Sequence, residues 1–155
     1  QAIAARGLAN VRVLRQDAVE VFEQRLAPRS IDRVMLLFPD PWPKKRHHKR
    51  RIVQPAFLTL LAQALKPGGI LHMATDWMPY AEVMAEVGDA HPAFERIVDP
   101  AALAEATLRP PTRFERRGER LGHEVRDLAW RRRAAPQAHE RPSVPAPSRA
   151  GDRFN

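Results

Sequence analysis

The Asp40 carboxylate and the residues around it are of types that could bind a nucleobase. Asp40 belongs to the run 38–44 (FPDPWPK), whose first residue, Phe38, is also the last residue of an apolar stretch. A carboxylate accepts hydrogen bonds from base edges that carry N–H donors, and the Watson–Crick edge of guanine carries such donors. Asp40 could also serve as a general base. Trp42 could stack on an unpaired base, or it could cover the core at the end of a strand.

Prolines restrict the backbone around Asp40. Each proline disfavours helical backbone in the residue before it, so we expect Phe38, Asp40 and Trp42 to be extended. The loop should therefore be stiff, with the Asp40 carboxylate held in one place.

A dense run of cations follows at residues 44–51 (KKRHHKRR). Such a run most often forms a solvated surface. Here it lies beside an aromatic ring and a fixed carboxylate, and a partner that supplies phosphates would relieve the repulsion between its charges. Adjacent histidines rarely bind the same ion, so we interpret His47 and His48 as part of the cationic surface and expect no metal site.

The composition sets the class of partner. The chain has 155 residues, room for about one domain, and its net charge of +8 indicates a polyanionic partner, either nucleic acid or an anionic membrane surface. No apolar run approaches the roughly 18 residues that a membrane span needs, so we expect no membrane insertion. The chain has 0 Cys, which excludes disulfides and thiolate zinc sites and fits a cytoplasmic location.

The elements that must position these residues alternate between strands and helices. Apolar spacing and turn residues predict a helix end at 1–6, a strand from 11 to Asp17, a helix at 19–26, a strand at 31–38, a helix at 53–65, a strand at 70–75, a helix at 79–88, and strands at 94–98 and 125–130. Gly7 and Gly88 are expected near helix ends, and the segment between 98 and 111 is expected to be irregular. This alternation predicts βαβ units with a parallel sheet and a buried strand at 34–38.

Three aspartates follow three of these strands. In open parallel sheets, ligands bind beyond the carboxyl ends of the strands, where Asp17, Asp40 and Asp76 are expected. A single aspartate at such a position is more often a helix N-cap. Three at the same edge favour a binding site.

Several motifs occur in the same order as in a known protein family. They are Asp17-Ala18, the 38–42 sequence FPDPW with its basic run, Thr75-Asp76-Trp77, 112–118 (TRFERRG) and 120–123 (RLGH). Over residues 1 to about 132 they resemble the bacterial tRNA (guanine-46-N7)-methyltransferase family. The DPW sequence followed by a basic run is the most specific of these motifs.

The resemblance implies an α/β class I S-adenosylmethionine-dependent (Rossmann-like) methyltransferase fold. The implied reaction is transfer of a methyl group from S-adenosylmethionine to N7 of guanine 46 in tRNA. Asp17 and Ala18 would lie at the adenine end of the cofactor, and Asp40 would be catalytic where cofactor and guanine meet. The implied tRNA contacts are Lys44, Arg46, Lys49, Arg50, Arg51, Asp76, Thr112, Arg113, Phe114 and Glu115. Glu115 could instead pair with Arg113 or Arg116.

The chain departs from the family pattern at its beginning. The 7 glycines include no cluster before Asp17 that matches the family's glycine-rich turn after the first strand. An acidic residue after the second strand is not found either. We therefore expect the amino-terminal strands of the fold to be missing, and the chain alone to have little or no activity. Residues 1–132 would be the carboxyl-terminal part of the domain, and 133–155 a flexible basic tail.

Other functions are compatible with the same residues. A non-catalytic RNA-binding module would use the basic run and Trp42 without a cofactor. A hydrolase could pair Asp40 with Asp76, but it needs one carboxylic acid that stays protonated, and the surrounding cations favour ionised carboxylates. Another methyltransferase of the same fold is a further alternative. The sequence does not decide between monomer and homodimer.

Overall fold

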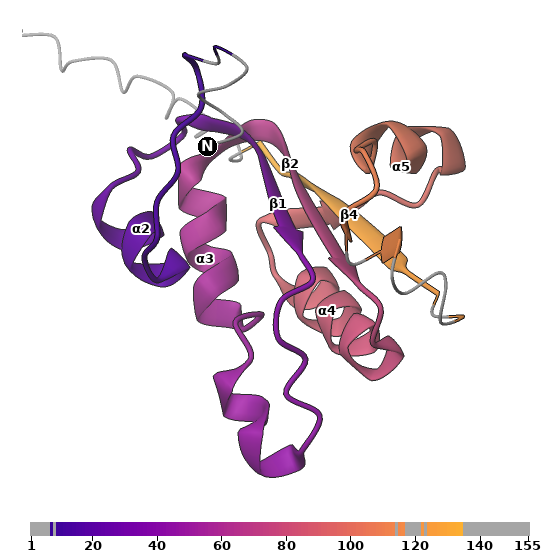
Figure 1. Ribbon diagram of the computed structural model, residues 1–155. Coiled ribbons are helices and arrows are strands. Elements are labelled where there is room, and N and C mark those ends of the chain that lie inside the picture. The colour runs from indigo at the N-terminus through magenta and orange to yellow at the C-terminus, as the bar shows by residue number, and fades with distance from the viewer. Residues whose placement is uncertain (1–6, 8, 114, 117–121, 123, 135–155) are drawn as a thin grey trace, which may run out of the picture.

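The computed structural model describes residues 7, 9–113, 115–116, 122 and 124–134, and these form one mixed sheet with helices on both faces (Figure 1). The strands are β1 (Ile31–Leu37), β2 (Leu65–Thr75), β3 (Phe94–Arg96) and β4 (Arg126–Arg132), in the order β1-β2-β4-β3. The helices are α2 (Ala18–Gln24), the 3-10 helix η1 (Lys45–Arg50), α3 (Pro55–Ala64), α4 (Met78–Ala90) and α5 (Pro100–Ala106).

The predicted parallel pairing is correct for β1 and β2, which α3 connects. It is wrong for β4, which is antiparallel to both β2 and β3. The segment between α5 and β4 returns the chain to the carboxyl end of β2, where Arg126 pairs with Thr75. Because β4 enters the sheet at that end, it runs opposite to its neighbours.

The two faces of β2 and β4 pack against different helices. Leu71, Met73, Leu128 and Trp130 join α3 and α4 in the main core. The alternate residues point to the opposite face, where Ala129 packs with Ile97 and Ala106 of α5. This alternation is the period of two expected of strands. His72 and Asp127 belong to that second face, and both contribute to the site described below.

Gly88 lies in the last turn of α4, near the end of the helix as predicted. A Cβ atom at position 88 would lie 2.4 Å from Cζ2 of Trp130, so the glycine lets the helix approach the sheet closely. Trp130 is held there because its Nε1 donates a hydrogen bond to Asp89 Oδ1 at 2.8 Å.

Two further predictions of secondary structure are wrong. Residues 11–16 form no strand, and Val13 is 75% exposed, because no strand of the described chain lies beside them to pair with their backbone. Helix α5 occupies a segment expected to be irregular. Its start carries a recognisable signal, since the Asp99 carboxylate accepts from Ala102 N at 2.9 Å and Pro100 takes the first helical turn.

Strand β1 is less buried than expected. It pairs only with β2 among the described strands, and Met35 is 49% exposed. The predicted helix end at 1–6 and all but the first residues of the predicted tail lie outside the described residues. Within the described part of the chain, no helix has the length and apolar content needed to cross a membrane.

Candidate functional site

Asp40 and Asp76 lie at the same edge of the sheet, as predicted. Strands β1 and β2 are parallel, and Phe38 N donates a hydrogen bond to Ala74 O at 2.8 Å at the point where both strands end. Both aspartates follow that point within two residues and are exposed. Figure 1 shows the two strand ends side by side, with η1 beyond the end of β1.

Asp17 does not follow a strand, and its carboxylate caps α2 by accepting from Val19 N at 2.8 Å. It also borders a cavity of about 490 Å³ between the amino-terminal ends of α2 and α3 and the end of η1. A volume of about 300–1,000 Å³ is usual for cofactor and small-molecule sites. The cavity is lined by Asp17, Val19, Glu23, Arg50, Arg51, Ile52, Gln54, Ala56, Phe57 and Leu60.

The loop that holds Asp40 has unusual backbone. Phe38 and Trp42 have φ of 52° and 40°, so the extended backbone predicted for these two residues is wrong. Bulky side chains in this region cost about 1–3 kcal/mol each and persist only where surrounding contacts hold them. The loop is thus fixed by its contacts, in addition to its prolines.

Those contacts involve both aromatic rings. Cζ of Arg50 lies 5.0 Å from the centroid of the Trp42 ring, and the His47 ring meets the same indole edge-on at 5.8 Å. Cζ of Arg109 lies 5.7 Å from the Phe38 ring. Asp40 itself makes no hydrogen bond or ion pair with the described residues, so its carboxylate is available to a ligand.

Arg51, for which a contact with the tRNA backbone is predicted, lies beneath this loop and is largely buried. Only 5% of the residue is exposed, its Nε donates to Pro41 O at 2.8 Å, and its Cζ lies 4.8 Å from the Tyr80 ring. Burial raises the pKa of the Tyr80 hydroxyl, which accepts a hydrogen bond from Val53 N. Arg51 therefore supports the Asp40 loop from inside.

The other predicted cations of the basic run are exposed. Lys44 precedes η1, and Arg46, Lys49 and Arg50 lie within it. They form the cationic surface of η1 next to Trp42. No group of three or more side chains that could hold a metal ion occurs in the described residues.

Replacing Arg50 by alanine should weaken tRNA binding. If the guanidinium contacts a phosphate, the slope of log affinity against log salt should fall by about 0.7–0.9. Filter binding of the chain to tRNA over a salt series measures this slope. Arg131→Ala is the matched control, because Arg131 is exposed but pairs with Ile70, at the end of the β2–β4 ladder that is away from Thr75. An unchanged slope in Arg50→Ala would exclude the contact.

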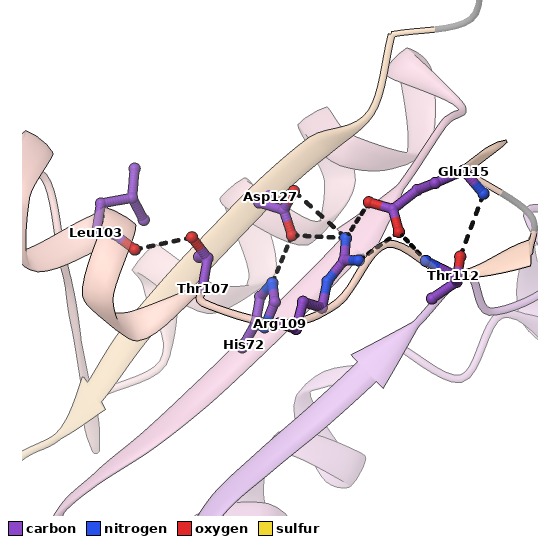
Figure 2. A network of polar contacts seen from close by, with 7 residues as sticks. All are labelled: His72, Leu103, Thr107, Arg109, Thr112, Glu115 and Asp127. Carbon is purple, nitrogen blue, oxygen red and sulfur yellow. Dashed lines mark hydrogen bonds and ion pairs between the residues drawn. The ribbon is translucent and has the colours of Figure 1, made fainter. Parts of the chain in front are cut away.

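Glu115, for which a contact with tRNA is predicted, is buried in a polar network in this structure (Figure 2). It accepts hydrogen bonds from both Nη atoms of Arg109, with Nη2 at 2.6 Å from Oε1. Thr112 N donates to its carboxylate at 2.5 Å, and Glu115 N donates to Thr112 Oγ1 at 3.2 Å. Thr112 and Glu115 thus form a capping box.

The network continues to the sheet. Arg109 Nη2 donates to Asp127 Oδ1 at 3.1 Å, and Nε2 of the fully buried His72 lies 2.5 Å from the same oxygen. The hydrogen bonds from Arg109 hold the pKa of the Glu115 carboxyl below its usual range, and Glu115 in turn raises the pKa of Arg109. Arg113 is exposed, whereas Phe114 lies outside the described residues.

Sequence reasoning missed Arg109, Asp127 and His72. The T-x-x-E spacing of Thr112 and Glu115 is a known capping signature and could have predicted that Glu115 folds back on its own segment. No comparable signal joins His72 to Asp127, which are 55 residues apart and meet only through the pairing of β2 with β4.

An exposed carboxylate edge, a cavity of about 490 Å³ and a cationic surface thus lie at one end of the α/β sheet. Residues 1–128 match the family described as "Putative methyltransferase". The chain belongs to this family and has its class I S-adenosylmethionine-dependent methyltransferase fold.

Curated proteins that are similar to this chain share a more specific name. Proteins named tRNA (guanine-N(7)-)-methyltransferase from Leifsonia xyli, Stutzerimonas stutzeri and Pseudomonas aeruginosa are 53%, 55% and 55% identical over 131 residues. The match covers 84% of this chain in each case, and 58%, 55% and 54% of the relatives. The chain therefore spans about half the length of the curated relatives it matches. Among solved structures, one similar protein is the aminoglycoside resistance methyltransferase NpmB1. The match covers 68% of this chain and 53% of the NpmB1 chain, at 17% sequence identity and a TM-score of 0.39.

Proposed function

We propose that this chain takes part in the transfer of a methyl group from S-adenosylmethionine to N7 of guanine 46 in tRNA. The observation that carries the proposal is the state of Asp40. Its carboxylate is exposed and unbonded within the described chain, yet the backbone on either side is held by contacts to Phe38, Pro41 and Trp42. A fixed acceptor without an internal partner is suited to an external donor.

The chemistry requires positioning more than proton transfer. Guanine N7 has a lone pair and no proton, so no strong base is needed to activate it. Asp40 would accept hydrogen bonds from the Watson–Crick edge of the base, which holds the ring and raises the electron density at N7. Alignment of this kind accounts for much of the rate increase in enzymatic displacement reactions.

The cavity beside Asp17 would hold the adenosine part of the cofactor. Its volume of about 490 Å³ is within the usual range, and it combines an apolar wall with a carboxylate at the start of α2. Asp17 and Ala18 would hold that end of the cofactor, which when bound supplies an electrophilic methyl group. The cationic surface of η1 would bind the phosphates of the tRNA, with Asp76 and Arg113 as further contacts.

A chimera tests the proposal, because the chain spans only part of its relatives. It joins the chain to the portion of the Pseudomonas aeruginosa relative that the match leaves out. The chimera is incubated with tRNA and methyl-labelled S-adenosylmethionine, and N7-methylguanine is located by borohydride reduction and aniline cleavage. We expect methylation at guanine 46, none in a transcript with adenine 46, and little or none by the chain alone.

The competing function has a distinct outcome. The chimera could fold and bind tRNA but transfer no methyl group, and its affinity for tRNA could be the same with and without S-adenosylmethionine. That result would indicate a non-catalytic RNA-binding module. Methylation at other guanines in the adenine-46 transcript would contradict the assigned position while retaining the reaction.

A further inference from the structure

We propose that Arg109 is a positioning residue that fixes two tRNA-facing segments relative to each other. The inference rests on the proposed function, because it concerns how the same edge is built. One segment is the turn that starts at Thr112 and carries the exposed Arg113 and Arg116. The other is the Asp40 loop, which Arg109 reaches through the Phe38 ring.

The guanidinium of Arg109 is the junction of the network in Figure 2. Its side chain is 6% exposed, and its two Nη atoms donate to Glu115, with Nη2 also donating to Asp127. Glu115 belongs to the turn and Asp127 to β4, so one side chain joins the turn to the sheet. A planar guanidinium can satisfy two carboxylates at once, which a lysine ammonium does not do with the same geometry.

Charge explains why the junction needs a cation. Glu115 and Asp127 both lie against Arg109 where little water reaches, with 11% and 30% of their side chains exposed. Without Arg109 the two carboxylates would face each other with no cation between them, and the free energy of the arrangement would rise. Among the described residues His72 is hydrogen-bonded to Asp127 and not to Glu115, so it does not replace the bonds from Arg109 to Glu115. The turn would then detach from the sheet.

Detachment would affect recognition through the capping box. Glu115 holds Thr112 through two hydrogen bonds, and these orient the turn from which Arg113 and Arg116 project. Arg109 is itself too buried to contact a phosphate. Its effect on tRNA must therefore act through the segments that it holds.

Arg109→Gln and the milder Arg109→Lys test the inference in the chain itself. The matched control is Arg96→Gln, because Arg96 also pairs with a carboxylate, Asp89 at 2.9 Å, and lies 5.6 Å from an aromatic ring, that of Trp130. One measurement is the rate of limited trypsin cleavage after Arg113 and Arg116. The other is the slope of log tRNA affinity against log salt, measured at a temperature where each variant is folded.

We expect Arg109→Gln to raise the cleavage rate at both arginines at least tenfold and to lower the salt slope by about 1–2, as expected for loss of one or two phosphate contacts. Arg109→Lys should have intermediate values, and Arg96→Gln should leave both unchanged. A salt slope equal to the parent's in Arg109→Gln would overturn the inference, even if its melting temperature fell. If the proposed function is wrong, the unsubstituted chimera transfers no methyl group. If only this inference is wrong, the unsubstituted protein behaves as proposed and the Arg109 variants keep its salt slope.

Discussion

Replacing Asp40 by alanine should reduce methyl transfer by the chimera at least about 100-fold, the size of effect seen when one preorganised electrostatic contact is lost. The substitution removes the acceptor proposed to hold guanine. It should change the free energy of unfolding by less than about 0.5 kcal/mol, because the carboxylate is exposed and makes no bond within the described chain. Single-turnover methylation and urea unfolding measure the two quantities.

Asp32→Ala is the control for this variant. Asp32 lies on β1, its side chain is 80% exposed, and its only ion pair in the described chain is with Lys66 at 2.7 Å. It should keep full activity, because it lies at the start of the strand and away from the carboxyl edge. Turnover by Asp40→Ala close to that of Asp32→Ala would remove the role assigned to Asp40.

Replacing Gly88 by alanine should destabilise the chain by about 1–3 kcal/mol, the usual cost of forcing one extra carbon into a packed core. The added Cβ would lie 2.4 Å and 2.5 Å from Cζ2 and Cε2 of Trp130. Neither side can move freely, since Gly88 lies in a helix backbone and Asp89 accepts a hydrogen bond from the indole. Urea unfolding followed by circular dichroism measures the loss.

A double-mutant cycle with Trp130→Phe identifies the cause. The atom nearest the added carbon is Cζ2, which belongs to the six-membered ring of the indole, and phenylalanine has no second fused ring. The alanine should therefore cost less in the Trp130→Phe background than in the parent. Equal costs in both backgrounds would show that the helix itself, and not the contact with the ring, disfavours alanine.

Local signals predicted most of the fold. The apolar runs that became β1 and β2, and the helical spacing that became α3 and α4, were readable because each element buries one face. The antiparallel insertion of β4 was not predictable in this way. It depends on the path of the segment that follows α5, and no local pattern encodes that path.

The carboxyl edge was predicted for a general reason, because parallel strands end together and Asp40 and Asp76 each follow one. The burial of Arg51 and Glu115 was not predicted, because a charged residue is normally exposed. Here a carbonyl with an aromatic ring satisfies Arg51, and a guanidinium satisfies Glu115. These partners are distant in sequence or belong to a turn whose packing only the folded chain defines.

The left-handed φ values of Phe38 and Trp42 have a consequence for thermal adaptation. Glycine at either position would relax the backbone, so selection for heat resistance alone would favour it. The same change would remove a ring on which a cation rests and would loosen the loop. Tolerance of heat and rate of turnover should therefore oppose each other at these two positions, and lineages that adapt to high temperature should gain stability elsewhere in the fold.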